Sequence, residues 1–350
     1  MLSRLCNGIC NNASSSVFHV TRGLALSSIR GARSNFSNKF AQTHAFKIRQ
    51  QAGTSLKERL LGPTTGKPYL YGTYALIGGS AFGIGLLCYY GLGITKEQSL
   101  MDRAAIWPEY VRTRLHHTYG YLAGGLAITA GAGLAAARSP RLLALTSNGS
   151  LVTFAVSLAA IIGTGMLARS IDYNNTIPKH LAWALHAGVM GAVLAPLVFV
   201  GGPVLFRAAW YTAGLVGGLS ALAMCAPSEK FLNMGAPLAM GLGVVFVANI
   251  GAFFFPPGTA LGAGLYSIVL YGGLILFSAF LLYDTQRIVK HAEMTPEASS
   301  RMAYNQFGQP MTITERGHGF DPINASISLY LDIINIFIRM VMLSGGQRRK

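Results

Sequence analysis

Long apolar segments follow one another along the chain, and short turns containing proline, glycine or charge separate them. A helix needs about twenty apolar residues to cross a bilayer. Eight segments meet this length, residues 69–94, 118–137, 151–168, 180–200, 204–225, 234–255, 260–283 and 323–343. The only long connections are 95–114 and 284–322. The pattern predicts an all-α fold class, a compact polytopic bundle of about eight transmembrane helices.

The composition agrees with a membrane protein and excludes large soluble domains. Only 11% of the 350 residues are charged and 51% are hydrophobic, whereas about 25% of the residues in soluble globular proteins are charged. A soluble surface cannot be built from so few charges. The formal net charge of +16 might by itself suggest a nucleic-acid partner, so its origin has to be found.

The first 57 residues hold much of this basicity. They contain no Asp or Glu, eight Lys or Arg and nine Ser, which is typical of a mitochondrial presequence. We expect this leader to be partly or wholly cleaved; the alternative is a disordered basic tail that binds anionic lipid or nucleic acid. Residues 344–350 form a basic C-terminal tail with three further cations, Arg348, Arg349 and Lys350. The basicity therefore gives no support for a nucleic-acid partner.

The loop cations are distributed unevenly. Connections after the first, third, fifth and seventh segments hold eleven Lys or Arg, and the other connections hold three. The positive-inside rule would place the richer side in the matrix, but a presequence delivers the N-terminus there first, so the orientation stays open. The basic loop before the second segment suggests docking of anionic lipid such as cardiolipin, with a solvated charged loop as the alternative; its aromatic and basic residues are Trp107, Tyr110, Arg112 and Arg114.

Two of the twelve acidic residues fall in or at the edge of an apolar segment. Asp284 follows the end of segment 260–283, and Asp332 lies near the middle of segment 323–343. A charged residue at membrane depth costs at least about 2.5–3.5 kcal/mol on insertion scales, so both are candidate functional residues.

Polar residues of the last segment form a single stripe. Asn324, Ser328, Asp332, Asn335 and Arg339 fall within an arc of about 80° on a helix. Lipid cannot satisfy such a stripe, so we expect it to face the bundle interior or water. The preceding segment has a companion stripe of Ser267, Tyr271, Ser278 and Thr285. Asp284 lies about 100° from that line, so its side chain need not share the same groove.

Two carboxylates on consecutive membrane helices allow several roles. If they lie close together they share a proton and respond to pH. Deprotonated, they offer hard oxygen ligands to a transported cation such as Ca²⁺. Alternatively, each carboxyl only hydrogen-bonds a neighbouring helix or reaches an interface. No Cys/His cluster has the spacing of a metal site, and no nucleophile–base pair stands out, so we expect no cofactor and no enzyme activity.

The same residues carry a family resemblance. The run from Gly273 to Gln286, GLILFSAFLLYDTQ, and the run from Ser328 to Phe337, SLYLDIINIF, resemble the last two helix motifs of the Bax-inhibitor (transmembrane Bax inhibitor motif) family. The basic leader is typical of its mitochondrial branch. The resemblance implies a seven-helix bundle over residues 115–343, with a central last helix, preceded by one extra helix and loop in residues 58–114.

The resemblance also implies a function. It makes Asp284 and Asp332 a pH-sensing pair that latches a Ca²⁺ path and binds the transported ion. It further implies a basic partner, for which Arg169 is the candidate, and an acidic path residue in the early helices, which segment 151–168 lacks. Partners implied by the resemblance are inner-membrane proteins of cristae, or cytochrome c.

We therefore expect a multi-pass protein of the mitochondrial inner membrane that transports cations coupled to protons, as Ca²⁺/H⁺ exchange, pH-gated Ca²⁺ efflux or K⁺/H⁺ exchange. Such transport would contribute to cristae organisation and apoptosis control. The residues expected to line the path are Asn324, Ser328, Asn335, Arg339 and Ser278. The alternative is a structural protein that maintains cristae and restrains cytochrome c release without transporting ions.

Overall fold

A computed structural model describes residues 60–91, 99–104, 106–147, 150–227, 230–295, 299–304, 309–315 and 319–346. The predicted leader and the three terminal cations lie outside these residues. Within them, eight helical segments are long and apolar enough to cross a membrane, which confirms the predicted polytopic all-α class. The helices and strands follow in the order α3 Lys67–Gly91, α4 Leu100–Ala104, α5 Glu109–Ala137, α6 Pro140–Ser147, α7 Leu151–Ser170, α8 Thr176–Leu194, η1 Ala195–Val200, α9 Gly202–Cys225, η2 Leu232–Met234, α10 Gly235–Phe254, α11 Ala260–Ser267, η3 Ile268–Gly272, α12 Gly273–Met294, β1 Ser299–Tyr304, β2 Pro310–Glu315 and α13 Pro322–Gly346.

Side-chain caps begin several of these helices where the sequence changes from polar to apolar. Ser150 accepts the Thr153 amide at the start of α7, and Thr259 accepts the Gly262 amide at the start of α11. Asp321 does the same for α13, because its Oδ1 accepts the Asn324 amide at 3.0 Å. Such caps satisfy amides that have no partner within the helix.

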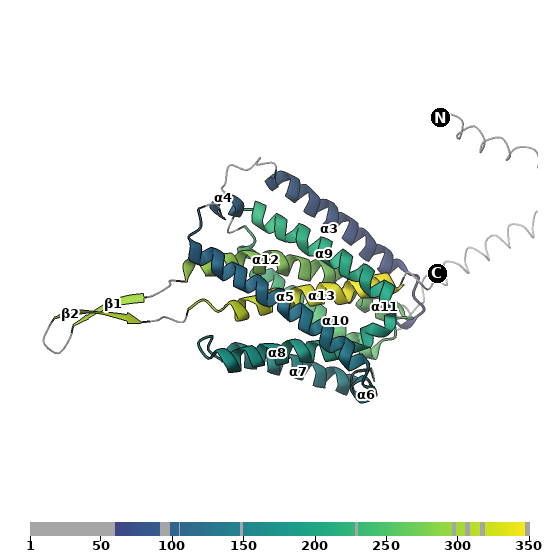
Figure 1. Ribbon diagram of the computed structural model, residues 1–350. Coiled ribbons are helices and arrows are strands. Elements are labelled where there is room, and N and C mark those ends of the chain that lie inside the picture. Colours follow the sequence, from purple (N-terminus) through teal and green to yellow (C-terminus); the bar gives the residue numbers. More distant parts are fainter. Residues whose placement is uncertain are drawn as a thin grey trace, which may run out of the picture. The chain divides into compact units, whose positions relative to one another are not determined.

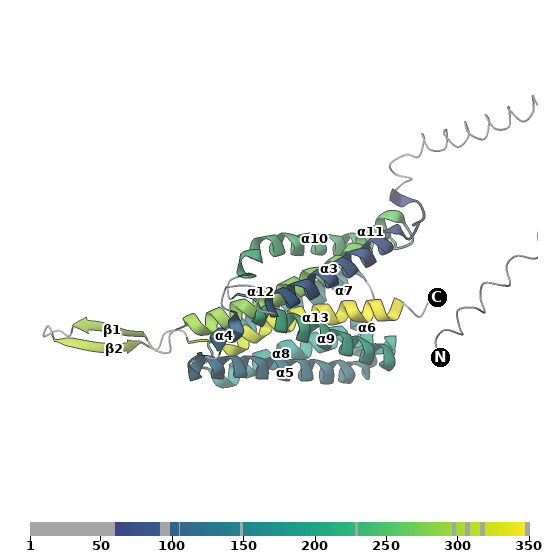
Figure 2. The ribbon, with the colours of Figure 1, turned by 90° about the horizontal axis from the view of Figure 1, so that it is seen from above.

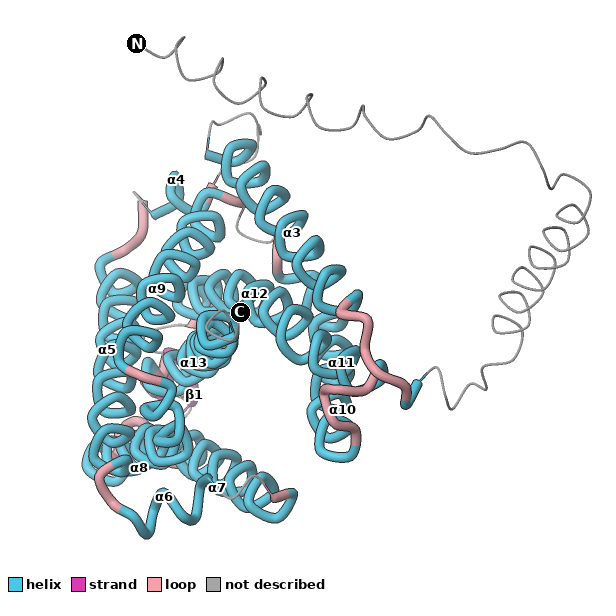
Figure 3. The backbone as a smooth tube through the Cα atoms, turned by 90° about the vertical axis from the view of Figure 1, so that its right-hand side faces the viewer, coloured by secondary structure: helices cyan, strands magenta, loops and turns pink. Residues whose placement is uncertain are grey.

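The last helix, α13, lies at the centre of the bundle, as the resemblance implies. It packs against α5, α9 and α12, which surround it when the bundle is viewed along its axis (Figure 3). Half of its membrane-spanning window is buried inside the protein, against 6% for α3 and α7. The polar stripe of α13 is therefore shielded from lipid by the other helices.

The connections alternate between the two ends of the bundle. The connections after α3, α7, α9 and α12 lie at one end, which we call the hairpin end (Figures 1 and 2). There the α12–α13 connection contains β1 and β2, paired antiparallel from Ser299 opposite Glu315 to Tyr304 opposite Pro310. The sequence pattern alone predicts only a long connection here. We call the opposite end, where α13 finishes, the C-terminal end.

The predicted end of the seventh span is wrong by eleven residues. Helix α12 continues to Met294, so Asp284 lies near the middle of this helix and not at its end. The polar extension of α12 beyond Tyr283 is held by the first turns of α5: Arg114 donates to the carbonyls of Ala292 and Thr295 at 2.9 and 2.7 Å. Cations at a helix C-terminus satisfy its last carbonyls.

The extension also forms an ion pair. Glu293 accepts hydrogen bonds from Arg103 at 2.9 Å and from the Trp107 indole at 2.7 Å. Two of the aromatic and basic residues expected to dock lipid, Trp107 and Arg114, therefore contact α12. Binding of anionic lipid by this region stays a prediction.

Helices α5 and α8 make the most extensive contact of the bundle and cross where two glycines meet. A Cβ on Gly191 would lie 2.8 Å from the Ala132 Cβ and 2.9 Å from the Gly133 amide nitrogen. Close backbone approach of this kind replaces hydrophobic association between helices in lipid.

The seventh span is interrupted by η3, a π-helical turn. The predicted companion stripe is wrong for this reason, because such a turn shifts every earlier residue around the helix axis. Ser267 and Tyr271 contact α3: Ser267 donates to the Pro68 carbonyl at 2.8 Å, and Gly72 packs against the Tyr271 ring.

Candidate functional site

Asp284 and Asp332 come together between α12 and α13. Their residues are 7% and 5% exposed, and their carboxyl groups are close enough to interact electrostatically. Asp332 Oδ2 has no hydrogen-bond partner among the described residues. Two carboxylates this close repel each other when both are ionised, so one proton between them stabilises the contact.

This contact was not expected from helical angles. The angle of about 100° between Asp284 and the companion stripe was measured on an ideal helix, whereas the real helix contains η3. Within α12, Asp284 faces α13. Thr285, one residue later, is buried and donates a hydrogen bond to the Leu281 carbonyl at 2.6 Å.

A polar cavity of about 680 Å³ opens near the carboxyl pair. It lies between the α7–α8 connection, the second half of α12 and the first turns of α13. Its lining includes Arg169, Tyr173, Arg287, Asn324 and Ser328. Asp284 precedes Arg287 by three residues and Asp332 follows Ser328 by four, so both carboxyls lie about one helical turn, roughly 5 Å, deeper than the cavity lining.

Two arginines that line the cavity, Arg287 and Arg169, place positive charge near the carboxyl pair. Arg287 Nη1 lies 3.9 Å from Asp284 Oδ1, and 64% of the Arg287 side chain is exposed. Arg169, in the last turn of α7, also acts electrostatically on Asp284. The structure thus places the candidate basic partner beside the carboxyl pair. The Arg287–Asp284 ion pair, with an exposed arginine and a separation of 3.9 Å, is weak and easily rearranged.

The stripe of α13 has two parts. Asn324 and Ser328 line the cavity, and their role in lining an ion path stays a prediction. Beyond Asp332, Arg339 Nη1 donates two hydrogen bonds to Asn335, to its backbone carbonyl at 2.8 Å and to Asn335 Oδ1 at 3.1 Å. Ser278 is half-buried on α12, and its role in lining a path stays a prediction.

Lys179 is a central residue that the sequence analysis counted only as a loop cation. Its side chain is fully buried, and its Nζ lies 2.6 Å from Asp321 Oδ2. It also donates to the carbonyls of Ala168 and Ile171, both at 2.8 Å, and to Asn324 Oδ1 at 2.9 Å. A lysine directly before apolar segment 180–200 was the available signal.

Gln286, the last residue of the first motif, is a second missed residue. It is fully buried, accepts the Phe231 amide at 2.9 Å and donates to the Pro227 carbonyl at 2.8 Å. It therefore attaches the α9–α10 connection to α12. The motif thus combines a carboxyl that faces α13 with an amide that fixes the neighbouring loop.

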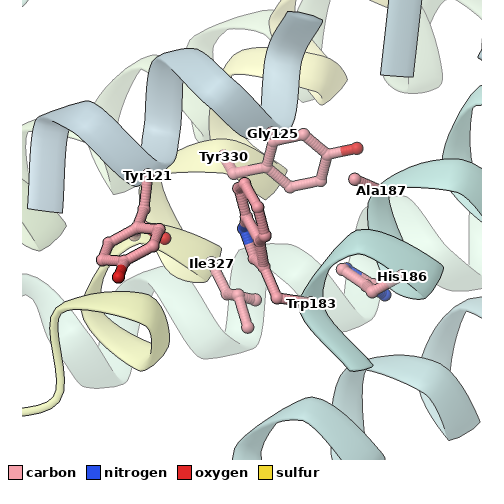
Figure 4. Close-up of a pocket in the computed structure, with 8 residues that line it drawn as sticks. Tyr121, Gly125, Trp183, His186, Ala187, Ile327 and Tyr330 are labelled. Carbon is pink, nitrogen blue, oxygen red and sulfur yellow. The ribbon is translucent and has the colours of Figure 1, made fainter. Parts of the chain in front are cut away.

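A second polar cluster lies between α5, α8 and α13, around a narrow pocket with no room for a water molecule (Figure 4). The Tyr330 hydroxyl lies 2.5 Å from Thr129 Oγ1, and His186 Nδ1 lies 3.0 Å from Thr164 Oγ1. His186 Nε2 is buried without a partner among the described residues. The cluster fixes α13 laterally, two residues before Asp332.

Carboxyl groups can bind protons or hard cations. Within the described ranges, no group of three or more His, Cys, Asp or Glu could hold a metal ion. Calcium takes six to eight oxygen ligands, several of them from water in weak sites. The carboxyl pair can supply the charged ligands, and the adjacent cavity is large enough for the water.

Eight membrane-spanning helices and a buried acid pair between the last two define a multi-pass helical membrane protein. The chain belongs to the Bax inhibitor family, since the family described as "Inhibitor of apoptosis-promoting Bax1" matches residues 111–349. The chain is 51% identical over 307 residues to the "Growth hormone-inducible transmembrane protein" of Rattus norvegicus, covering 86% of this chain and 84% of the relative. It is 22% identical over 241 residues to the "Inner membrane protein YbhL" of Escherichia coli strain K12, covering 68% of this chain and 93% of the relative. No solved structure matches the chain. The predicted family membership is confirmed.

Proposed function

We propose that this protein transports cations coupled to protons, with Ca²⁺ as the main substrate. The observation that supports this most directly is the Asp284–Asp332 carboxyl pair, buried between α12 and α13 about one turn below a polar cavity. Protons and Ca²⁺ compete for the same oxygen atoms. With a proton bound the two helices stay joined; when it leaves, the paired negative charge attracts a cation and favours separation of α12 from α13.

The cavity gives the pair access from the hairpin end. That end carries the connections after spans one, three, five and seven, which hold eleven Lys or Arg, against three in the other connections and three in the C-terminal tail. By the positive-inside rule we assign it to the matrix, in the inner mitochondrial membrane that the acid-free leader predicts. Calcium would then enter the cavity from the matrix, pass Arg287 and reach the acid pair. K⁺/H⁺ exchange is a variant of the same competition.

The family description also names apoptosis. We propose that control of apoptosis and of cristae organisation follows from this ion transport, with cristae proteins, cytochrome c and cardiolipin as the partners to examine. The competing proposal is a structural role that needs no transport. The two proposals differ in what neutralising the carboxyls does.

Ion flux in proteoliposomes tests the proposal. The chain without its leader is reconstituted with an entrapped Ca²⁺ indicator and a pH dye, and wild type is compared with Asp284→Asn, Asp332→Asn and the double variant. We expect Asp332→Asn to reduce Ca²⁺ flux at least tenfold and to abolish its pH response. Asp172→Asn is the matched control, because this exposed acid lines the same cavity and bonds only Asn174.

The outcomes separate the two proposals. Loss of flux in the carboxyl variants but not in Asp172→Asn supports transport through the pair. Flux and pH response that survive both substitutions would show that the mechanism is wrong. Rescue of cristae shape by a transport-dead variant in cells that lack the protein would favour the structural role.

A further inference from the structure

Arg339 carries a buried charge that no carboxylate of the described residues neutralises. The residue is 5% exposed and lies inside the last membrane span. The ion pairs of the described residues join Arg103 to Glu293, Lys179 to Asp321 and Arg287 to Asp284, and none includes Arg339. An unpaired guanidinium at this depth is costly, so its position calls for a functional explanation.

The π-helical turn η3 holds this guanidinium. Arg339 Nε donates to the carbonyl of Val269 in η3 at 3.1 Å, and Arg339 Cζ lies 4.6 Å from the centre of the Phe277 ring. A π-helical turn leaves carbonyls without their usual helical partners, so η3 supplies an acceptor that a regular helix would not. Asn335, one turn earlier on α13, completes the set.

The guanidinium of Arg339 occupies space that is available because residue 273 is a glycine. A Cβ on Gly273 would lie 2.7 Å from Arg339 Nη2 and 2.8 Å from its Cζ. Any side chain at this position would displace the arginine from the turn. Gly273 directly follows η3, so turn, glycine and arginine form one arrangement.

The location of Arg339 relative to the carboxyl pair indicates what the arrangement of η3, Gly273 and Arg339 can do. Seven residues separate Asp332 from Arg339, so they lie on one face of α13, about two turns or 10 Å apart. The cavity opens on the hairpin-end side of the pair, where Ser328 lines it, while Arg339 lies toward the C-terminal end. A cation that leaves the pair in that direction meets the guanidinium next.

We propose that Arg339 is the electrostatic barrier that closes the cation path on the side of the carboxyl pair away from the cavity. The inference rests on the proposed function for the direction of ion flow. The π-helical turn holds the barrier in place through Val269, and release of that hydrogen bond opens the second half of the path. Coupling then requires two events, proton release at the pair and displacement of the guanidinium.

Leak measurements on charge variants test the barrier. Wild type, Arg339→Gln and Arg339→Lys are reconstituted, and the K⁺ and Ca²⁺ permeability of the vesicles is measured at a pH that keeps wild type closed. We expect Arg339→Gln to leak at least tenfold more than wild type, and Arg339→Lys, which keeps the charge, to leak less than threefold more. Arg207→Gln, at an exposed position on α9, is the control.

A second variant protects the test against a folding defect. Gly273→Ala keeps the arginine and moves it away from the turn, so it should also leak. Gly264→Ala is its control, because nothing lies within 4 Å of a Cβ there. Each purified variant is accepted only if it is monodisperse in detergent.

The failure of this inference and the failure of the proposed function can be told apart. If wild type transports Ca²⁺ through the pair but neither Arg339→Gln nor Gly273→Ala leaks, the barrier is refuted and the proposed function stands. If wild type shows no coupled flux but both variants leak, the barrier stands and the coupled transport is refuted. Leak in Arg339→Lys equal to that in Arg339→Gln would also refute a barrier made of charge.

Discussion

Lys179 Nζ lies 2.6 Å from Asp321 Oδ2, and this contact joins the beginning of α8 to the beginning of α13. The lysine satisfies two carbonyls at the C-terminus of α7, while the aspartate caps the first turn of α13. Both helices border the cavity at this point. The pair therefore fixes the entrance to the carboxyl site as well as the packing of the central helix.

Replacing Lys179 should destabilise the protein strongly. Removing one partner of a buried ion pair costs about 3–5 kcal/mol, and the partly exposed Asp321 places the expected loss for Lys179→Met near the lower end. The thermal unfolding midpoint in detergent measures the effect. Lys67→Met, at an exposed lysine, should leave the midpoint unchanged.

The double variant Lys179→Met with Asp321→Asn separates charge from packing. If the unpaired carboxylate causes most of the loss, the second substitution should recover part of it. A double variant that is less stable than Lys179→Met alone would show instead that the cap of α13 matters more than the charge.

The sequence predicted some of these features well because they depend on local pattern. The eight spans follow from the length of the apolar runs, and the stripe from Asn324 to Arg339 follows from regular geometry, since α13 is uninterrupted. The prediction of the companion stripe was wrong because a π-helical turn leaves no periodic signal in the sequence. Lys179 was missed because its partners come from α7 and α13, and no local pattern shows a contact between distant segments.

Gln286→Met should also lower stability. The substitution keeps the volume but leaves the Phe231 amide and the Pro227 carbonyl without their partner. An unsatisfied buried polar group costs about 1–3 kcal/mol. Gln286→Glu keeps the acceptor for Phe231 but loses the donor to Pro227 and adds a buried charge, so its unfolding midpoint should also lie below that of wild type. A Gln286→Met protein as stable as wild type would contradict a role in fixing the α9–α10 connection.

Gly191→Ala should weaken the α5–α8 crossing. The new methyl group would meet the Ala132 side chain and the Gly133 backbone, and overpacking of this kind costs about 1–3 kcal/mol. Gly188→Ala is the matched control on the same helix, with nothing within 4 Å of its Cβ. Helix propensity alone predicts that this control is neutral or stabilising by up to about 1 kcal/mol. Equal unfolding midpoints for the two variants would show that the crossing tolerates separation.

Gly72→Ala tests whether α3, which precedes the matched family region, supports the π-helical turn. A Cβ on Gly72 would lie 2.6 Å from Tyr271 Cγ, so Tyr271 and with it η3 must shift, or α3 must move away. Because η3 also holds Arg339 through Val269, we expect both a lower unfolding midpoint and an increased cation leak. Gly78→Ala, on the same helix with nothing within 4 Å of its Cβ, should change neither property. A lower midpoint without added leak would show that α3 stabilises the bundle without influencing the barrier, because the turn then keeps its hold on the guanidinium when its outer support is disturbed.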